Sequence, residues 1–407
     1  MKKITILSIL ALLALFSSES VAQIEFGGTI DVQALTAGKD ANFVDTGVPE
    51  DFRHFHFGVA QLNLLGFAPI NDKFFVETRL GFTSYGTGKI EDFKLILGSL
   101  TYQHSETFSL TAGRFITPFG FYGDRQLVID RTFVDLPLNY TYFTNISSEL
   151  GLIGRKFRYN NSYGDSLDSQ LSTVFYEVYN TGLRFDWQPQ GRNMLISGAL
   201  TNQAISQFDL SNNPSYGGSL RIRFTPSATY EWALSAAHGT YFNESELNAS
   251  IQGDVNFQEL TQTSLSLYNR LQFTYFEIVG EAMFTNWKSP VFQDTLYLPS
   301  ATPFIRDGSG KPVVTDVQNI GANVDLKYEP PSMTGTYFAI RAEYLSFFEI
   351  DNPVNGDPYQ WDLDLMRYNF GIGHKFSRNV VAKLVFTDQD KLDFGQFTFR
   401  AYITAAF

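Results

Sequence analysis

The sequence of 407 residues contains no cysteine, and only five of its residues are histidine. Missing thiols exclude disulfide bonds, thiolate catalysis and cysteine-based metal sites. The few histidines form no recognised metal-binding motif, and no arrangement of serine, histidine and aspartate is evident. The sequence therefore predicts neither an enzyme nor a metal or cofactor site. A membrane-embedded hydrolase remains an alternative for which no particular serine can be nominated.

Long apolar runs and an excess of positive charge are also missing. Beyond residue 23 there is no run of about 18 apolar residues, so no transmembrane helix is indicated. The chain has 30 basic and 42 acidic residues, a formal charge of -12. Without residues 1–22 it has 28 basic and 41 acidic residues, a charge of -13. This acidic balance argues against a nucleic-acid partner.

The N-terminus has the pattern of a secretory signal peptide. Lys2 and Lys3 precede an apolar run at residues 4–16, and Ser20-Val21-Ala22 supplies a small-x-small cleavage site. The apolar run is too short to cross a bilayer as a helix. We therefore expect residues 1–22 to be cleaved after export and residues 23–407 to form the mature protein. An uncleaved anchor is the alternative.

Aromatic residues, by contrast, are abundant, with 39 phenylalanines and 21 tyrosines. In the last segment Phe399, Ile403 and Phe407 fall on one face of an extended strand, and Thr398 and Arg400 fall on the other. An exposed strand edge of this kind invites aggregation unless it pairs with the first strand and closes a barrel. A terminal phenylalanine after such alternation resembles the signal that bacterial outer-membrane β-barrels present to the barrel-assembly machinery. The alternative is the edge strand of a soluble β-domain.

Similar alternation recurs along the chain and predicts an all-β fold. We expect a transmembrane antiparallel β-barrel of about sixteen strands, surrounded by outer-membrane lipid, because short connections alternate with long ones as turns and external loops do in such barrels. Eighteen strands would result if the 181–191 connection and the long loops hold a further pair. Strands are expected at residues 24–34, 52–64, 73–82, 93–104, 107–115, 150–159, 169–179, 193–201, 216–225, 231–239, 263–274, 275–285, 316–328, 337–348, 365–376, 379–387 and 394–407.

The alternation stops between residues 116 and 149. Long stretches without regular structure inside compact folds are usually functional. The stretch begins with Pro118, Phe119 and Gly120. Proline removes a backbone donor and glycine permits an unusual turn, so together they end the strand and redirect the chain inward. An ordinary external loop with a Pro-Gly turn is the alternative.

Residues 112–120 read AGRFITPFG, which resembles the porin O and P family of phosphate-selective outer-membrane porins. In that family a strand ending in Gly-Arg-Phe leads into Thr-Pro-Phe-Gly and an inward-folded loop. The resemblance implies a sixteen-stranded channel, often a homotrimer, with a constriction loop that corresponds here to residues 117–148. It also implies passive diffusion of small hydrophilic solutes or ions, with anions such as phosphate among the candidates.

Charged residues of both signs occur in this loop and on the strands expected around it. Opposed charges across a narrow pore create a transverse field that filters solutes, and a salt-bridge network that stiffens the loop explains them equally well. Arg114 either lines the pore or anchors a loop carboxylate. Strand charges are expected to face the lumen, because a charge facing lipid costs a few kcal/mol. The candidate residues are Arg114, Asp124, Arg125, Asp130, Arg131, Asp135, Arg155, Arg221 and Arg223.

Together these features favour a passive diffusion channel in the outer membrane of a Gram-negative bacterium. Two long loops, at residues 241–260 and 287–315, also fit a structural or surface-interaction barrel whose lumen is blocked by loops. A secreted soluble β-propeller is a further alternative, which would disperse without detergent.

Overall fold

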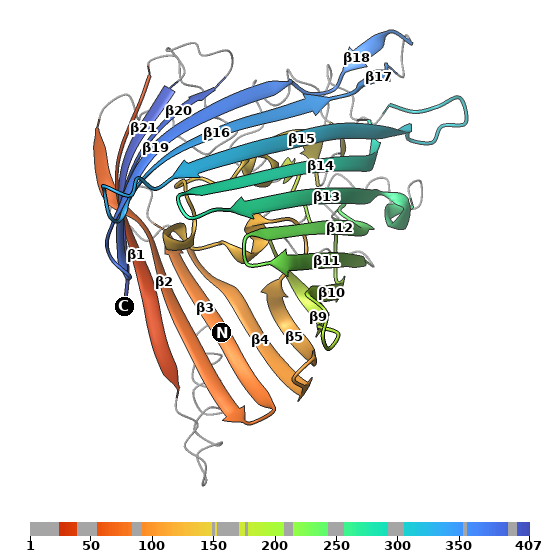
Figure 1. Ribbon diagram of the computed structural model, residues 1–407. Helices are drawn as coiled ribbons and strands as arrows, with labels where there is room; N and C mark the ends of the chain where they lie inside the picture. The colour runs from red at the N-terminus through yellow and green to blue at the C-terminus, as the bar shows by residue number, and fades with distance from the viewer. Residues whose placement is uncertain are drawn as a thin grey trace.

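Sixteen antiparallel strands close into a barrel in the computed structural model, which describes residues 24–38, 55–83, 92–148, 151–152, 171–175, 178–206, 215–242, 256–291, 305–352, 356–389 and 397–407 (Figure 1). The order around the ring follows the sequence. The barrel strands are β1 (Glu25–Ala37), β2 (His56–Asn71), β3 (Phe74–Thr83), β4 (Asp92–Ser105), β5 (Phe108–Ile116), β9 (Tyr179–Trp187), β10 (Met194–Thr201), β11 (Gly217–Ser227), β12 (Tyr230–Thr240), β13 (Thr261–Gln272), β14 (Phe276–Pro290), β15 (Val314–Tyr328), β16 (Thr336–Phe347), β19 (Leu365–Ser377), β20 (Val380–Gln389) and β21 (Phe397–Ala406).

Smaller elements lie between these strands. In the described part of the connection from β5 to β9 there are a three-stranded sheet and three short helical turns, and a two-stranded ribbon follows β16. They are β6 (Phe143–Ser147), β7 (Gly151–Leu152), β8 (Leu171–Thr173), β17 (Glu349–Asp351), β18 (Pro358–Gln360), the 3-10 helices η2 (Tyr122–Asp124), η3 (Val128–Asp130) and η5 (Phe257–Glu259), and the α-helix α2 (Leu138–Thr141). No helix in the described ranges is long and apolar enough to cross a membrane.

The predicted closure between the first and last strands is confirmed. β1 pairs with β21 antiparallel, in a register that runs from Thr29 opposite Ala406 to Ala37 opposite Thr398. The terminal residue extends the seam: the amide of Gly28 donates to the carbonyl of Phe407 at 2.9 Å, and the amide of Phe407 donates back at 3.0 Å. Hydrogen bonding therefore continues around the ring and leaves no open edge at this point.

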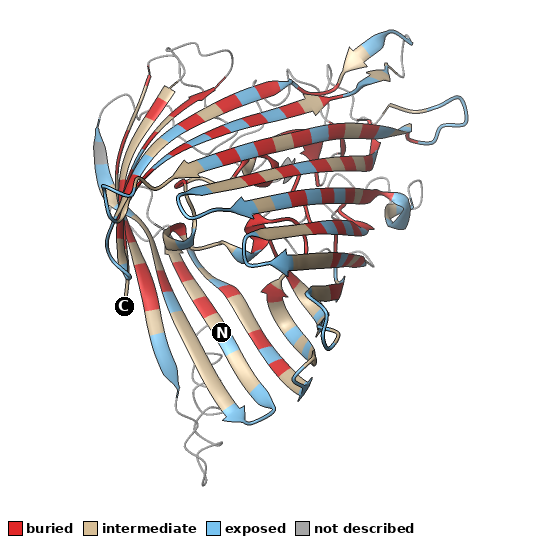
Figure 2. Ribbon diagram, in the orientation of Figure 1, coloured by how far each residue is buried: buried red, intermediate tan, exposed pale blue. Residues whose placement is uncertain are grey.

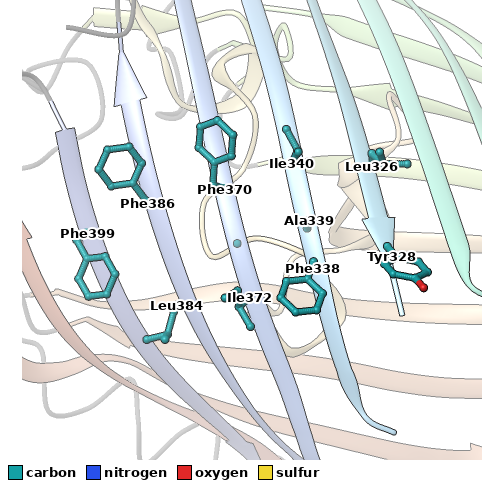
Figure 3. Close-up of a pocket in the computed structure, with 11 residues that line it drawn as sticks. Leu326, Tyr328, Phe338, Ala339, Ile340, Phe370, Ile372, Leu384, Phe386 and Phe399 are labelled. Atoms are coloured by element: carbon teal, nitrogen blue, oxygen red, sulfur yellow. The ribbon is translucent and has the colours of Figure 1, made fainter. Parts of the chain in front are cut away.

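Burial alternates along the strands as the sequence pattern predicts. On β16 the burial pattern changes at almost every residue, with Arg341 and Glu343 buried and Phe338 and Ile340 exposed (Figure 2). Apolar side chains on the outside match a lipid environment, and polar ones face the lumen. The outer face carries a shallow apolar groove of about 480 Å³, between side chains of β15, β16 and β19–β21 (Figure 3).

Short connections gather at the end of the barrel that holds both termini of the described chain, and long ones at the other end. The turn between β2 and β3 is only Asp72–Lys73, because β2 continues past Pro69, where the register shifts. Proline lacks an amide donor and is tolerated in strands at such irregularities. β2 thus extends beyond residue 64, where the predicted strand ends, as far as Asn71.

The structure differs from three strand predictions in the residues that it describes; residues 153–159, 169–170 and 176–177 lie outside them. Of residues 150–159 and 169–179, only the described residues Gly151–Leu152 and Leu171–Thr173 are strands before β9, and both lie in the small sheet of β6, β7 and β8. Residues 181–191, predicted as a connection, instead contain most of β9, a strand of the barrel wall. An alternating pattern does not distinguish a wall strand from a strand inside the lumen, because both have one polar and one apolar face.

Candidate functional site

The connection from β5 to β9 folds into the barrel (gold in Figure 1). Its described residues, 117–148, 151–152, 171–175 and 178, are called here the lumen loop. Its entry is fixed where the amide of Thr117 donates to the carbonyl of Val178 at 2.8 Å. Four residues later the amide of Phe121 donates to Glu281 Oε1 on β14, also at 2.8 Å. In the ring, five strands, β9 to β13, separate β5 from β14. The chain therefore crosses part of the lumen between Thr117 and Phe121.

Gly120 makes this turn possible. Its φ of +65° lies in the left-handed region, and a Cβ there would lie 2.2 Å from Tyr140 Oη and 2.9 Å from Glu281 Oε1. Only glycine fits both the conformation and the space. The preceding Pro118 is buried, and the Phe119 ring is fully buried edge-on against Phe175, with centroids 5.2 Å apart. Pro118, Phe119 and Gly120 thus lie where the chain leaves β5 and turns towards β14.

Acidic side chains on β14, β15 and β16 accept hydrogen bonds from the lumen loop. Glu281 accepts from Tyr140 Oη at 3.0 Å, and Asp325 accepts from Tyr122 Oη at 2.6 Å. Hydrogen bonds to ionised groups are stronger than neutral ones. Glu343 on β16 likewise accepts from the amide of Leu138, the first residue of α2.

Two buried arginines tie the same strands to loop carbonyls. Arg341 binds both oxygens of Asp325 at 2.7 Å and donates through Nη1 to the carbonyl of Asp135 at 2.9 Å. Arg367 repeats this arrangement one strand further on: it binds both oxygens of Glu343 at 2.9 Å and donates to the carbonyl of Leu136 at 2.8 Å. Each guanidinium is therefore neutralised by a carboxylate of the wall and also donates a hydrogen bond to a carbonyl of the lumen loop.

The next strands hold the middle of the lumen loop. Lys383 on β20 donates to the carbonyls of Val128 and Arg131, and Arg400 on β21 pairs with Asp135. Burial by itself would raise the pKa of Asp135, but Arg400 and three further arginines outweigh it and lower that pKa below its ordinary value of 3.8. This carboxylate is consequently ionised at neutral pH.

Around η2 the lumen loop forms ion pairs with β11 and β14. Asp124 pairs with Arg221 at 2.9 Å and with Arg223 at 3.4 Å, both on β11. Arg125 lies over the ring of Phe121, 4.4 Å from its centroid, with Glu277 of β14 at 3.8 Å. The structure thus brings predicted loop charges onto predicted wall charges, in the manner of the salt-bridge alternative.

An apolar core fills the long-loop end of the barrel beside the lumen loop. Tyr142 and Ile146 of the loop pack with Trp287, Phe347 and Trp361, all almost fully buried. The rings of Phe347 and Trp361 meet edge to face at 4.9 Å. The lumen face is therefore not uniformly polar, as simple alternation would suggest: at this end of β14–β16 it is apolar, because the loop covers it instead of water.

A cavity of about 480 Å³ remains between the lumen loop and the wall formed by β1–β5 and β9. At the end of the barrel with the short turns, three cavity-lining residues are paired across neighbouring strands: Glu25 is opposite Phe67, and Phe67 is opposite Glu77. Its wall also includes Arg79, which donates to Tyr179 Oη at 2.8 Å and to Asn63 Oδ1 at 2.9 Å. The loop contributes Asp124, Gln126, Leu127 and Asp130.

The remaining predicted residues are placed as follows. Arg114 Nε donates to the carbonyl of Ile96 on β4 at 2.9 Å, so it binds the neighbouring strand. Arg131 contributes its carbonyl to Lys383, and Asp130 is exposed. Arg155 lies outside the described residues. Within the described ranges, no three or more His, Asp or Glu side chains are grouped so as to hold a metal ion.

Asp325, Lys383 and Arg400 were not among the sequence candidates, although each anchors the lumen loop. Their only signal in the sequence is their place on the polar face of an alternating segment. Their loop partners lie far away along the chain, and Tyr122 is 203 residues from Asp325. Only the folded barrel brings such pairs together.

No protein-family model and no curated relative matches the sequence. Three solved structures are similar over nearly the whole length. The outer membrane channel DcaP of Acinetobacter baumannii has a TM-score of 0.53 at 11% identity, covering 96% of this chain and 99% of that one. OmpT of Vibrio cholerae in its trimer form gives 0.52 at 9%, covering 95% and 99%. An anion-selective porin from Comamonas acidovorans gives 0.51 at 12%, also covering 95% and 99%. At these identities the likeness shows the fold: that of porin-like outer-membrane barrels.

Proposed function

We propose that the protein is an outer-membrane porin, a passive diffusion channel for small hydrophilic solutes or ions that is narrowed by the lumen loop. The observation that carries this is the position of the loop. Most of its side-chain anchors are on β11–β16 and β19–β21, whereas the cavity lies on the other side, against β1–β5 and β9. The loop is thus held mainly to one wall and leaves space along the other.

Planar-bilayer recording of purified protein tests this proposal. Folded protein, identified by its faster migration in unheated gel samples, should give stepwise conductance increments. Removing residues 121–141, which contain η2, η3 and α2, should enlarge each increment because the loop no longer narrows the lumen. Folded protein that gives no increments would contradict the proposal.

The charged residues of the barrel wall give little support to the phosphate preference that residues 112–120 imply. An anion would need guanidinium groups that are not bound to carboxylates, but Arg341 and Arg367 are bound to carboxylates and loop carbonyls, and Arg221 is bound to Asp124. Among the described residues that line the cavity, Arg79 alone offers such a group. Transport of phosphate in particular therefore rests on the local resemblance alone. Liposome swelling with phosphate, sugars and amino acids compares these solutes directly.

A structural barrel with a blocked lumen is the second candidate, and the apolar core around Trp287 and Trp361 favours it. That core fills the long-loop end of β14–β16, where a solute would otherwise enter. The two candidates differ in swelling experiments: a blocked barrel gives liposomes that do not swell with any small sugar, whereas a porin admits those below its size limit.

We further propose that the mature chain begins at Gln23 after removal of residues 1–22, and that the barrel-assembly machinery inserts it into the outer membrane through the C-terminal strand. A homotrimer is proposed from the resemblance, and the trimer form of the similar Vibrio cholerae protein supports it. N-terminal sequencing of protein from outer-membrane fractions and chemical cross-linking in detergent test these points.

A further inference from the structure

We infer that the passage beside the lumen loop prefers cations to anions, an inference that rests on the proposed channel function. The inference depends on which charged side chains of the lumen are not neutralised by a partner and can therefore act on an ion in the passage. The cavity is lined by four carboxylates, those of Glu25, Glu77, Asp124 and Asp130, and by one guanidinium, that of Arg79.

Among these carboxylates, only that of Asp124 is neutralised by close partners. It pairs with Arg221 at 2.9 Å and Arg223 at 3.4 Å. Within the described part of the chain, no basic group lies within ion-pair distance of Glu25, Glu77 or Asp130. Three carboxylates thus act on the cavity against one guanidinium.

The positive charges of the lumen are engaged elsewhere. Arg341 and Arg367 are almost fully buried, each between a carboxylate and a loop carbonyl. Lys383 is buried beneath η3, where its ammonium group donates hydrogen bonds to two loop carbonyls. Arg341 and Arg367 are compensated by the carboxylates that they bind. Lys383 lies behind η3, where its charge interacts with those of Asp31 and Asp130.

One guanidinium closer to the passage is also compensated. The charge of Arg184 on β9 reaches Glu77, but its Nη2 is bound to Asp186 at 2.8 Å. Arg79 is 7% exposed and has the neutral partners Asn63 and Tyr179, so among the described residues that line the cavity its guanidinium is the one opposing charge. The balance at the cavity surface is therefore acidic.

The effect is a field along the passage and not a binding site for one ion. The carboxylates come from β1, β3 and the lumen loop, and the described residues contain no group of three or more that could hold a metal ion. Charged rings of this kind bias conduction towards ions of opposite sign without retaining them. Small monovalent cations and positively charged organic solutes are thus the favoured class.

The reversal potential of the wild-type channel in a potassium chloride gradient tests the inference. We expect the sign that indicates a potassium permeability above that of chloride. In the E77Q/D130N variant, the ratio of potassium to chloride permeability should fall by about twofold to threefold per carboxylate removed, as expected for a unit charge several ångströms from an ion in water. The matched control is E106Q, in the exposed turn between β4 and β5 at the same end of the barrel.

Each result decides between the possibilities. A wild-type channel that prefers chloride overturns the inference but leaves the porin function standing, and so does a permeability ratio that is equal in E77Q/D130N and wild type. If the double variant does not fold, the sign of the wild-type potential still decides. Folded wild-type protein without conductance rejects both the inference and the proposed function.

Discussion

The guanidinium of Arg341 on β16 lies side-on against the carboxylate of Asp325 on β15, with Nε to Oδ1 and Nη2 to Oδ2 both at 2.7 Å. The two side chains are 0% and 6% exposed. The hydroxyl of Tyr122, from the lumen loop, lies between them and donates to Asp325 at 2.6 Å. This pair therefore joins two wall strands and the loop at a single point.

Asp325→Asn should strongly destabilise the protein, because it leaves the buried charge of Arg341 without its partner. Breaking a buried pair by removing one member costs about 3–5 kcal/mol. Unfolding by guanidinium chloride in detergent, followed by tryptophan fluorescence, measures the decrease in the free energy of unfolding. The double variant D325L/R341M should lose less, because it removes both charges.

Lys375 and Glu329 provide the matched control for that experiment. Their charged atoms are 3.7 Å apart, but the side chains are 48% and 42% exposed. Solvent-exposed pairs contribute roughly 0–1 kcal/mol, so Lys375→Gln should have little effect. A loss as large as that of D325N would show that burial is not the cause.

Gly120→Ala should weaken the docking of the lumen loop. The left-handed φ costs any L-residue roughly 1–2 kcal/mol, and the new methyl group would also push against Tyr140 and Glu281, which help to anchor the loop. Single-channel recordings should show larger or more variable increments, and thermal unfolding should begin at a lower temperature.

Gly191→Ala separates the two causes. Gly191 also has a φ of +65°, but no atom lies within 4 Å of its Cβ position. It should show the backbone cost alone and an unchanged conductance. Equal effects of the two substitutions would argue against a steric role for Gly120.

Phe407→Ala should lower the yield of folded barrel. The Phe407 ring lies against Gly28 at the seam, within 2.9 Å of where a Cβ on Gly28 would be. The control is Phe376→Ala on β19, because these two rings are similarly exposed, at 66% for Phe376 and 67% for Phe407. Densitometry of unheated gel samples gives the folded fraction. An equal loss in both variants would assign the effect to lipid contact instead of closure.

The Asp135–Arg400 pair predicts how stability depends on pH. The pKa of Asp135 is lowered in the folded protein, so its contribution is fully present above about pH 5 and is lost as the pH falls through the folded-state pKa. The stability difference between wild type and D135N should therefore be constant from pH 8 to about pH 5 and shrink in more acid solution. Chemical unfolding at a series of pH values measures it, and a difference that grows in acid would contradict the assignment.

Much of the wall could be predicted from the sequence, because a strand with one face in lipid and one in the lumen must alternate. The positions of Ile403 and Thr404 on opposite faces of β21 follow from this rule. β9 had the same signal, with Leu183, Phe185 and Trp187 exposed at alternate positions. It was missed because the preceding segment, residues 169–179, looked equally like a strand and took its place in the count.

The lumen loop shows where prediction from sequence ended. The turn at Pro118–Gly120 has a local cause and was predictable. The identity of the residues that receive the loop was not: charges on the polar faces of β15, β16 and β19–β21 look alike in the sequence, whether they meet water or a loop. The apolar lining formed by Val317 and Leu345 gave no sign of a covering loop either.

By itself, the sequence determined a closed wall of alternating strands, because alternation depends on neighbouring residues, and its composition excluded thiol chemistry. The tertiary structure alone decided which wall the loop binds, which arginines are thereby neutralised and where space for a solute remains. Those outcomes depend on contacts between residues that lie one to three hundred positions apart, and only closure of the ring sets their distances.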